Sequence, residues 1–162
     1  MEFDRGWISS MMRGLGDGTQ NVVRLFGLDP EIIGRLVDRA LALSDAGKFD
    51  QAEGLLIDLV DLAPLAAGPL CLLGECRFKR GDLQGALRAF SESIERASSA
   101  ESGQIAQAAY GGRAQVLMAM NEVDLACSDL EKVKQGADKE WALFATRAID
   151  ALGKRRPSWN PE

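Results

Sequence analysis

Histidine is missing from the 162-residue sequence. Its absence removes the side chain that most often serves as a general base near neutral pH and as a metal ligand. No acidic pair stands apart from turns and helix caps, so no general acid–base set is visible. We therefore expect a protein that is not an enzyme and that uses no cofactor and no metal. An enzyme stays the minor alternative, which a deep polar pocket holding strongly perturbed ionisable groups would favour.

Long apolar runs and a cationic surplus are missing as well. No stretch reaches the roughly 18 apolar residues that a membrane-spanning helix needs. Residues 1–7 lack the basic region and apolar run of a secretory signal. We therefore expect a cytoplasmic protein without a membrane partner. The formal net charge is −5, which argues against a nucleic-acid partner because phosphates require a basic surface.

Cysteine is scarce and odd in number. Cys71, Cys76 and Cys127 show no Cys-x-x-Cys spacing. We interpret them as reduced thiols in the core of a cytosolic protein and not as a metal or redox site.

The sequence does contain a repeat. Its first copy is Gly47, Phe49, Ala52 and Leu56. The second copy follows 34 residues after the first, as Gly81, Leu83, Ala86 and Phe90. The third copy follows 40 residues after the second, as Asn121, Val123, Ala126 and Leu130. A period of 34 with small residues where two helices cross is the tetratricopeptide signature. Asn121 replaces the turn glycine, and asparagine also tolerates the left-handed backbone conformation.

These repeats predict an all-α fold. We expect three tetratricopeptide repeats forming a short right-handed superhelix, with N-terminal helices before them and a C-terminal capping helix after them. The expected repeat helices span residues 30–46, 50–62, 69–80, 82–97, 104–120 and 121–135, and the capping helix spans 138–152. The predicted organisation is an N-terminal helical segment at 1–28, repeats and cap at 29–152, and a flexible tail at 153–162.

The first helix of each repeat is expected to line a concave face that binds an extended peptide. The expected peptide-binding residues, which should be exposed without a peptide, are Val37, Leu41, Ser44, Cys71, Glu75, Phe78, Gln115 and Met118, with Gly111 and Gly112 beside them. Phe78 is the largest of them. It is interpreted as the wall of a peptide pocket, and packing against the next repeat is the alternative.

The same positions exclude one kind of peptide. Some repeat modules hold the C-terminal carboxylate of heat-shock chaperones. They use Lys and Asn on the first helix of repeat one, and Lys and Arg on the first helix of repeat three. The matching residues here are Val37, Leu41, Ala108 and Gly112. None of them can bind a carboxylate, so this subfamily is rejected.

The chain resembles the class II chaperones of bacterial type III secretion, which hold translocator proteins. The likeness covers about residues 13–152. It rests on the glycine-rich break at 13–18, the short helix expected at 19–26, Ala-Gly-Lys-Phe-Asp-Gln-Ala at 46–52, Leu-Gly-Glu-Cys-Arg at 73–77, and the spacing of 34 and then 40 residues. One departure is that this family often carries aromatic residues where the first inner helix here has Val37, Leu41 and Ser44, which suggests a client with different anchor residues.

The resemblance implies a cytoplasmic bacterial chaperone that is not an enzyme. Such proteins bind an extended segment of hydrophobic translocators in the concave groove and keep these subunits soluble and apart before secretion. Some also assist a transcriptional activator. The alternative is a generic tetratricopeptide scaffold or a co-chaperone of needle subunits.

Many members of this family are homodimers through their N-terminal helices. The apolar residues expected to form such a contact here are Trp7, Ile8, Met11, Met12 and Leu15. The resemblance favours the dimer, and packing of this segment on its own repeats is the alternative.

Overall fold

The computed structural model describes residues 30–64, 66–97 and 103–155. Within these ranges the chain forms seven helices and no strand. They are α3 (Pro30–Asp45), α4 (Phe49–Leu62), α5 (Ala67–Arg80), α6 (Leu83–Arg96), α7 (Gly103–Ala119), α8 (Val123–Lys134) and α9 (Lys139–Arg155). The expectation of an all-α protein is confirmed for this part of the chain.

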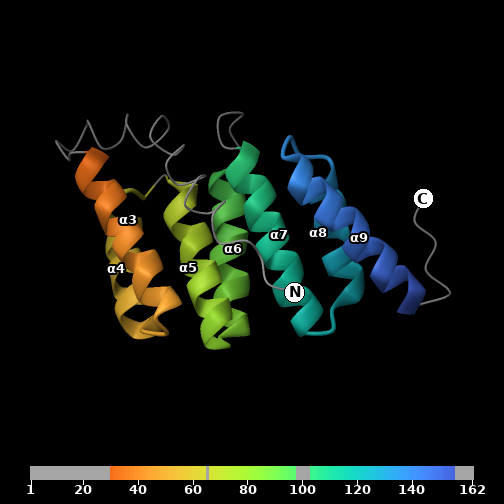
Figure 1. Cartoon of the computed structure of the whole chain (residues 1–162), viewed down its shortest axis with the longest axis horizontal. Helices are drawn as coiled ribbons and strands as arrows, with labels where there is room; N and C mark the ends of the chain where they lie inside the picture. Colours follow the sequence, from red (N-terminus) through yellow and green to blue (C-terminus); the bar gives the residue numbers. More distant parts are fainter. Residues whose placement is uncertain (1–29, 65, 98–102, 156–162) are drawn as a thin grey trace.

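The helices stand in a row of antiparallel pairs, α3–α4, α5–α6 and α7–α8, with α9 at the far end (Figure 1). Each helix packs on its neighbours in sequence, and α5 also contacts α3 and α7. The first helices of successive pairs therefore lie side by side. This is the arrangement of a solenoid, in which each unit buries its apolar face against the next one.

The turn inside each pair uses the residue that the repeat predicts. Gly47, Gly81 and Asn121 all have positive φ, at 74°, 89° and 62°. Each stands one or two residues after the last residue of the first helix of its pair, where the left-handed conformation lets the chain reverse. Asp82 then caps α6, because its Oδ1 accepts a hydrogen bond of 2.9 Å from the backbone N–H of Gly85. Asp138 caps α9 in the same way, because its Oδ1 accepts hydrogen bonds from the backbone N–H groups of Glu140 and Trp141.

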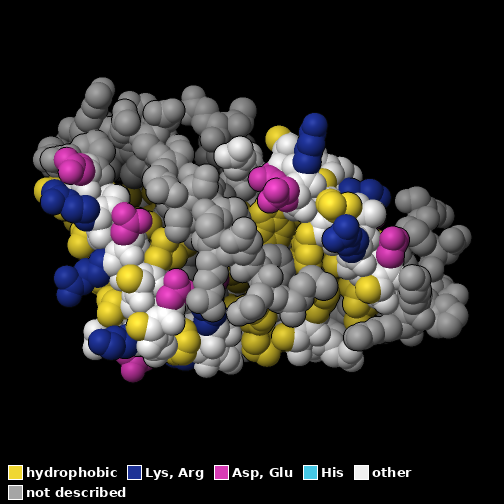
Figure 2. Space-filling model, viewed as in Figure 1, with side chains coloured by type: hydrophobic (Ala, Val, Ile, Leu, Met, Phe, Trp, Pro, Cys, Tyr) yellow, Lys and Arg dark blue, Asp and Glu magenta, His cyan; other side chains and the backbone are white. Residues whose placement is uncertain are grey.

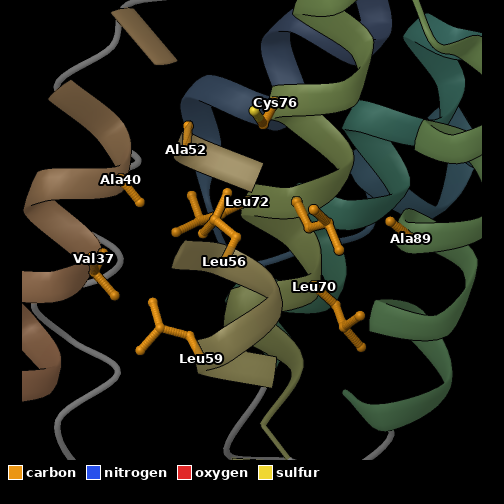
Figure 3. Close-up of a cluster of buried hydrophobic side chains, with 10 residues drawn as sticks. Val37, Ala40, Ala52, Leu56, Leu59, Leu70, Leu72, Cys76 and Ala89 are labelled. Atoms are coloured by element: carbon orange, nitrogen blue, oxygen red, sulfur yellow. The ribbon is translucent and has the colours of Figure 1, made fainter. Parts of the chain in front are cut away.

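Buried apolar side chains form three clusters along the row. The first lies between α3, α4 and α5 and is drawn in Figure 3, where Leu56, Leu59 and Leu72 contribute its larger side chains. The second joins α5, α6 and α7 around Phe90. The third joins α7, α8 and α9 around Trp141 and Leu130. The core is thus divided by repeat, with each cluster bridging one pair to the next helix.

The helix bounds agree with those expected to within two residues, except at the end of α9. This helix continues to Arg155, whereas the sequence pattern predicted an end at residue 152. One glycine costs about 1 kcal/mol in a helix interior and less near its end, so Gly153 does not stop the final turn. The N-terminal segment expected at 1–28 and residues 156–162 of the expected tail lie outside the described residues. No helix in the described part of the chain is long and apolar enough to cross a membrane.

Candidate peptide-binding face

The eight residues predicted to bind a peptide are carried by three neighbouring helices. Val37, Leu41 and Ser44 belong to α3, Cys71, Glu75 and Phe78 to α5, and Gln115 and Met118 to α7. Because α5 contacts both α3 and α7, the fold places these helices next to one another. Which of the eight side chains contact a peptide stays a prediction.

Five of the eight side chains are partly accessible. Leu41, Glu75, Phe78, Gln115 and Met118 are all half-buried. They offer three large apolar groups and two polar groups on adjacent helices. An extended peptide could bury apolar side chains against the former and hydrogen-bond to the latter.

The remaining three are buried, so the expectation that they would be exposed is wrong. Val37, Ser44 and Cys71 are each 6 % exposed. Val37 packs in the first apolar cluster and Cys71 in the second. The Ser44 side chain hydrogen-bonds to the thiol of Cys76. On a helix packed from two sides, the repeat frame alone does not separate positions facing the groove from positions facing a neighbouring helix.

Burial also determines the chemistry of the thiols. The three cysteines are buried and none of them forms a disulfide. Burial raises the pKa of the Cys71 thiol, and Glu75 raises it further. Burial likewise raises the pKa of Cys76, whose Sγ lies 3.7 Å from the carbonyl oxygen of Phe49. Thiols with raised pKa values are poor nucleophiles, in keeping with the interpretation of these residues as core thiols.

The structure agrees with the packing interpretation of Phe78, and its role as the wall of a peptide pocket stays a prediction. Its ring packs against the second cluster, which is built from α5, α6 and α7. The side chain is nevertheless only half-buried, so part of the ring stays accessible on the α5 surface. A residue anchored in this way can present a rigid apolar wall at little further entropic cost.

An ionic bridge crosses the C-terminal ends of α3 and α5. The Lys79 ammonium lies 2.9 Å from Glu75 Oε1 on its own helix and 3.4 Å from Asp45 Oδ1 on α3. Burial alone would lower the pKa of Lys79, but the two carboxylates raise it above its ordinary value. The bridge links α3 to α5 one turn after Leu41 and directly after Phe78. Asp45 and Lys79 are 34 residues apart, which is the period of the repeat, so the two residues occupy equivalent positions in neighbouring repeats. This spacing of opposite charges is the sequence signal from which the bridge could have been predicted.

The two glycines beside the predicted groove residues of α7 lie against aromatic rings. A Cβ atom at Gly111 would collide with the Trp141 ring of α9, and a Cβ atom at Gly112 would collide with the Phe90 ring of α6. Both positions are therefore occupied by packing within the chain. At this end of the face, Gln115 and Met118 remain accessible.

Charged and apolar side chains are interspersed on the surface of the described helices (Figure 2). Among the described residues, no group of three or more Cys, Asp or Glu side chains is placed to hold a metal ion. The predicted dimerisation residues, Trp7, Ile8, Met11, Met12 and Leu15, lie outside the described residues.

The geometry defines a class of protein. Three antiparallel helix pairs, each turning at a left-handed residue, stand in a row that one further helix closes. Among solved structures, this arrangement is similar to SycD, the type III secretion translocator chaperone of Yersinia enterocolitica. Two SycD structures, one of them described as an alternative dimer, match with TM-scores of 0.67 and 0.66 at 18 % identity. The matches cover 80 % and 82 % of this chain and 96 % of each SycD chain.

A third similar structure is a chain from a type III secretion complex of Aeromonas hydrophila. It matches with a TM-score of 0.67 at 19 % identity, over 85 % of this chain and 91 % of that chain. No protein-family model and no curated protein matches the sequence. The chain thus has the tetratricopeptide-like fold of the SycD chaperone, which confirms the predicted fold class and, at the level of the fold, the predicted resemblance.

Proposed function

We propose that this chain is a chaperone of type III secretion. In this proposal it binds an extended segment of hydrophobic translocator proteins on the face formed by α3, α5 and α7. Binding keeps these subunits soluble and apart from one another in the bacterial cytoplasm before they are secreted.

The observation that carries the proposal is the extent of the fold likeness. The match takes in nearly the whole of SycD, at 96 % of that chain, and 80 % of this chain. Short repeat arrays serve many unrelated purposes. A likeness that covers nearly all of the neighbouring chain favours the same use of the array over that of a generic scaffold.

The chemistry of the face suits a client with spaced apolar anchors. Leu41 on α3, Phe78 on α5 and Met118 on α7 each keep part of their side chain accessible. One apolar group on each of three adjacent helices matches an extended peptide that crosses the helices and buries alternate side chains. Methionine adapts its shape to different partners, which fits a chaperone with more than one client.

The face also carries groups that would orient such a peptide. Glu75 on α5 and Gln115 on α7 are half-buried. The Gln115 amide can donate and accept hydrogen bonds with an extended backbone. The Lys79 bridge to Glu75 and Asp45 would hold α3 and α5 at a fixed separation while the peptide binds. A preformed face loses less entropy on binding than one that must first be ordered.

We further propose that two copies associate through residues 1–28. This segment carries Trp7, Ile8, Met11, Met12 and Leu15, an apolar surface large enough to need a partner. The dimer is proposed from the sequence and from the resemblance that it carries.

The test is to identify what the chain binds in its native host. Tagged wild-type protein and a Phe78→Asp variant would be expressed at equal levels, purified, and their bound proteins identified by mass spectrometry. We expect translocator proteins with the wild type and their loss with Phe78→Asp, because the new carboxylate has no partner on an apolar face. Recovery of soluble proteins outside the secretion system, without any translocator, would overturn the proposal in favour of a generic scaffold.

A further inference from the structure

We propose that the outer face of α4 is a second docking surface, and that it binds a basic amphipathic helix of a partner protein. This inference is independent of the proposed peptide-binding face. It rests on one stripe of exposed residues, which we call the α4 stripe: Gly54, Ile57, Asp58, Asp61 and Leu62. Their spacing of i, i+3, i+4, i+7 and i+8 places all five on the same side of the helix, and all five are exposed.

The first observation is the apolar content of this surface. Ile57 is 40 % exposed and Leu62 is 41 % exposed, and Ile32 on the paired helix α3 is 46 % exposed. Across the described residues, five large apolar side chains are exposed to this degree, and the α3–α4 pair carries three of them. This pair stands at one end of the described row (Figure 1). In the next pair, the equivalent positions of α6 are also accessible and carry Arg88, Ser91, Glu92, Glu95 and Arg96, so α4 differs from α6 in placing large apolar groups on this surface.

The second observation is the charge. Helix α4 carries four acidic residues and no basic one. Arg80 forms ion pairs with Asp50 and Glu53, which neutralises the N-terminal half. Within the described residues, no ion pair reaches Asp58 or Asp61. The other second helices of the pairs, α6 and α8, have basic residues in their last turn, whereas α4 has none there. Asp61 therefore stands at the negative end of the α4 dipole without compensation.

The third observation is Gly54. A glycine inside an exposed helix is destabilising relative to alanine. Gly74, Gly111 and Gly112 are explained by close contacts with Phe90 or Trp141, but a Cβ atom at Gly54 would meet nothing within 4 Å. Packing among the chain's own residues does not require glycine here. A missing side chain at the centre of a helix face is what allows a second helix to approach closely.

Exposed apolar side chains, uncompensated acidic charges and a helix glycine each destabilise the chain on its own. One kind of partner would compensate for all three. A basic amphipathic helix would cover Ile57 and Leu62, place cations beside Asp58 and Asp61, and approach the backbone at Gly54. A second copy packed in an isologous way would instead bring Asp58 and Asp61 against their own equivalents, which like-charge repulsion disfavours. Charge complementarity thus selects a basic partner segment.

The test uses two synthetic helices as probes, one with leucines on one face and lysines on the other, and one with glutamates in place of the lysines. Fluorescence anisotropy would follow their binding to the full chain. We expect the lysine probe to bind and the glutamate probe not to bind. Gly54→Ala, Ile57→Ser and the double variant Asp58→Asn/Asp61→Asn should each weaken the lysine probe at least about tenfold, which is about 1.4 kcal/mol.

Matched controls separate this surface from general attraction. Gly34→Ala changes another exposed helix glycine with open space around it, and it should leave binding of the probe unchanged. Glu95→Gln/Asp150→Asn removes the same net charge from α6 and α9. If it weakens the lysine probe as much as Asp58→Asn/Asp61→Asn does, the attraction is non-specific and the proposal fails.

Three further outcomes would overturn the proposal without touching the peptide-binding face. Loss of the lysine probe with Phe78→Asp but not with Gly54→Ala would place it on the α3–α5–α7 face. We expect Gly54→Ala, like Gly34→Ala, to raise the melting temperature. A lower melting temperature for Gly54→Ala would mean that the chain itself already covers the α4 stripe. A change of sedimenting mass with Gly54→Ala would make a second copy the occupant.

Discussion

The ring of Phe90 on α6 lies where a side chain at Gly112 on α7 would have to stand. The same ring lies 2.8 Å from the place of a Cβ atom at Gly74 on α5. Phe90 is 3 % exposed and is part of the second apolar cluster. One aromatic side chain thus joins three helices, and two glycines make room for it.

This contact predicts that Gly112→Ala destabilises the fold. The added methyl group must displace a buried ring, and overpacking of this kind costs roughly 1–3 kcal/mol. Gly34→Ala is the matched control, since a Cβ atom there meets nothing within 4 Å and should stabilise the helix by up to about 1 kcal/mol. Thermal unfolding of both variants gives the comparison. A Gly112→Ala protein that melts at or above the wild-type temperature would show that the ring has room to move.

The turns and helix pairs could be predicted from sequence because they depend on local signals. Gly47, Gly81 and Asn121 recur at fixed places, and left-handed backbone restricts the choice of residue at each. Apolar periodicity then placed the helices to within two residues of their bounds at nearly every end. These features need no knowledge of what each helix packs against.

The candidate face was harder to predict because burial depends on contacts between distant residues. Val37 and Cys71 occupy the repeat positions that face a groove, yet they lie within the apolar clusters. Lys79 on α5 bridges Glu75 on its own helix and Asp45 on α3. A pattern within one helix cannot show which side a neighbouring helix covers, so these relationships appear only once the pairs are stacked.

Repeat three is held together by a buried carboxylate. Asp129 on α8 is 5 % exposed, and it accepts hydrogen bonds of 2.7 Å and 2.8 Å from Nε and Nη2 of Arg113 on α7. The hydrogen bonds and the charge of Asp129 raise the pKa of Arg113, so the guanidinium keeps its charge. Arg113 also donates a hydrogen bond of 3.1 Å to Ser91 on α6 and lies 5.4 Å from the centre of the Tyr110 ring.

We therefore expect Arg113→Met to lower the free energy of unfolding by about 2–3 kcal/mol, because it leaves a charged carboxylate buried and unpaired. Arg113→Met combined with Asp129→Asn should lose less than the two single variants added together, since the double variant removes the charge as well. Denaturant unfolding of the four proteins forms the cycle. Strict additivity would mean that the two side chains do not interact in solution.

The cap of α6 predicts a dependence of stability on pH. The hydrogen bond from the Gly85 N–H, with smaller help from Arg77 and Arg80, lowers the pKa of Asp82 below its ordinary value of 3.8. Ionised Asp82 therefore stabilises the fold fully above pH 3.8, and this contribution is lost as the pH falls through the lowered pKa.

Asp82→Ala should accordingly cost about 1 kcal/mol at neutral pH. The difference in melting temperature from the wild type should shrink as the pH falls below 3.8. Asp82→Asn keeps an oxygen acceptor and should lose less than Asp82→Ala at neutral pH. A penalty for Asp82→Ala that stays constant down to acid pH would contradict a role for the ionised carboxylate.

The proposed dimer predicts a change of mass on truncation. Deleting residues 1–20 removes Trp7, Ile8, Met11, Met12 and Leu15, and should convert a dimer into a monomer with the helical content of the repeats retained. Analytical ultracentrifugation at micromolar concentration measures the mass, and far-ultraviolet circular dichroism checks the repeats. Sedimentation of the full-length chain at the mass of one copy throughout would refute the dimer and leave the segment to pack on its own repeats.

The measurement that tests the account most directly is a titration of the chain with the translocator segment recovered from its native host. Isothermal titration calorimetry would compare the wild type with Leu41→Asp, Phe78→Asp and Ile57→Asp. The account predicts that the first two variants weaken binding at least about tenfold, or 1.4 kcal/mol, because each places an unpaired charge on the α3–α5–α7 face. Ile57→Asp, which lies on the outer face of α4, should bind like the wild type. Normal binding by both Leu41→Asp and Phe78→Asp, with all variants folded, would contradict the account.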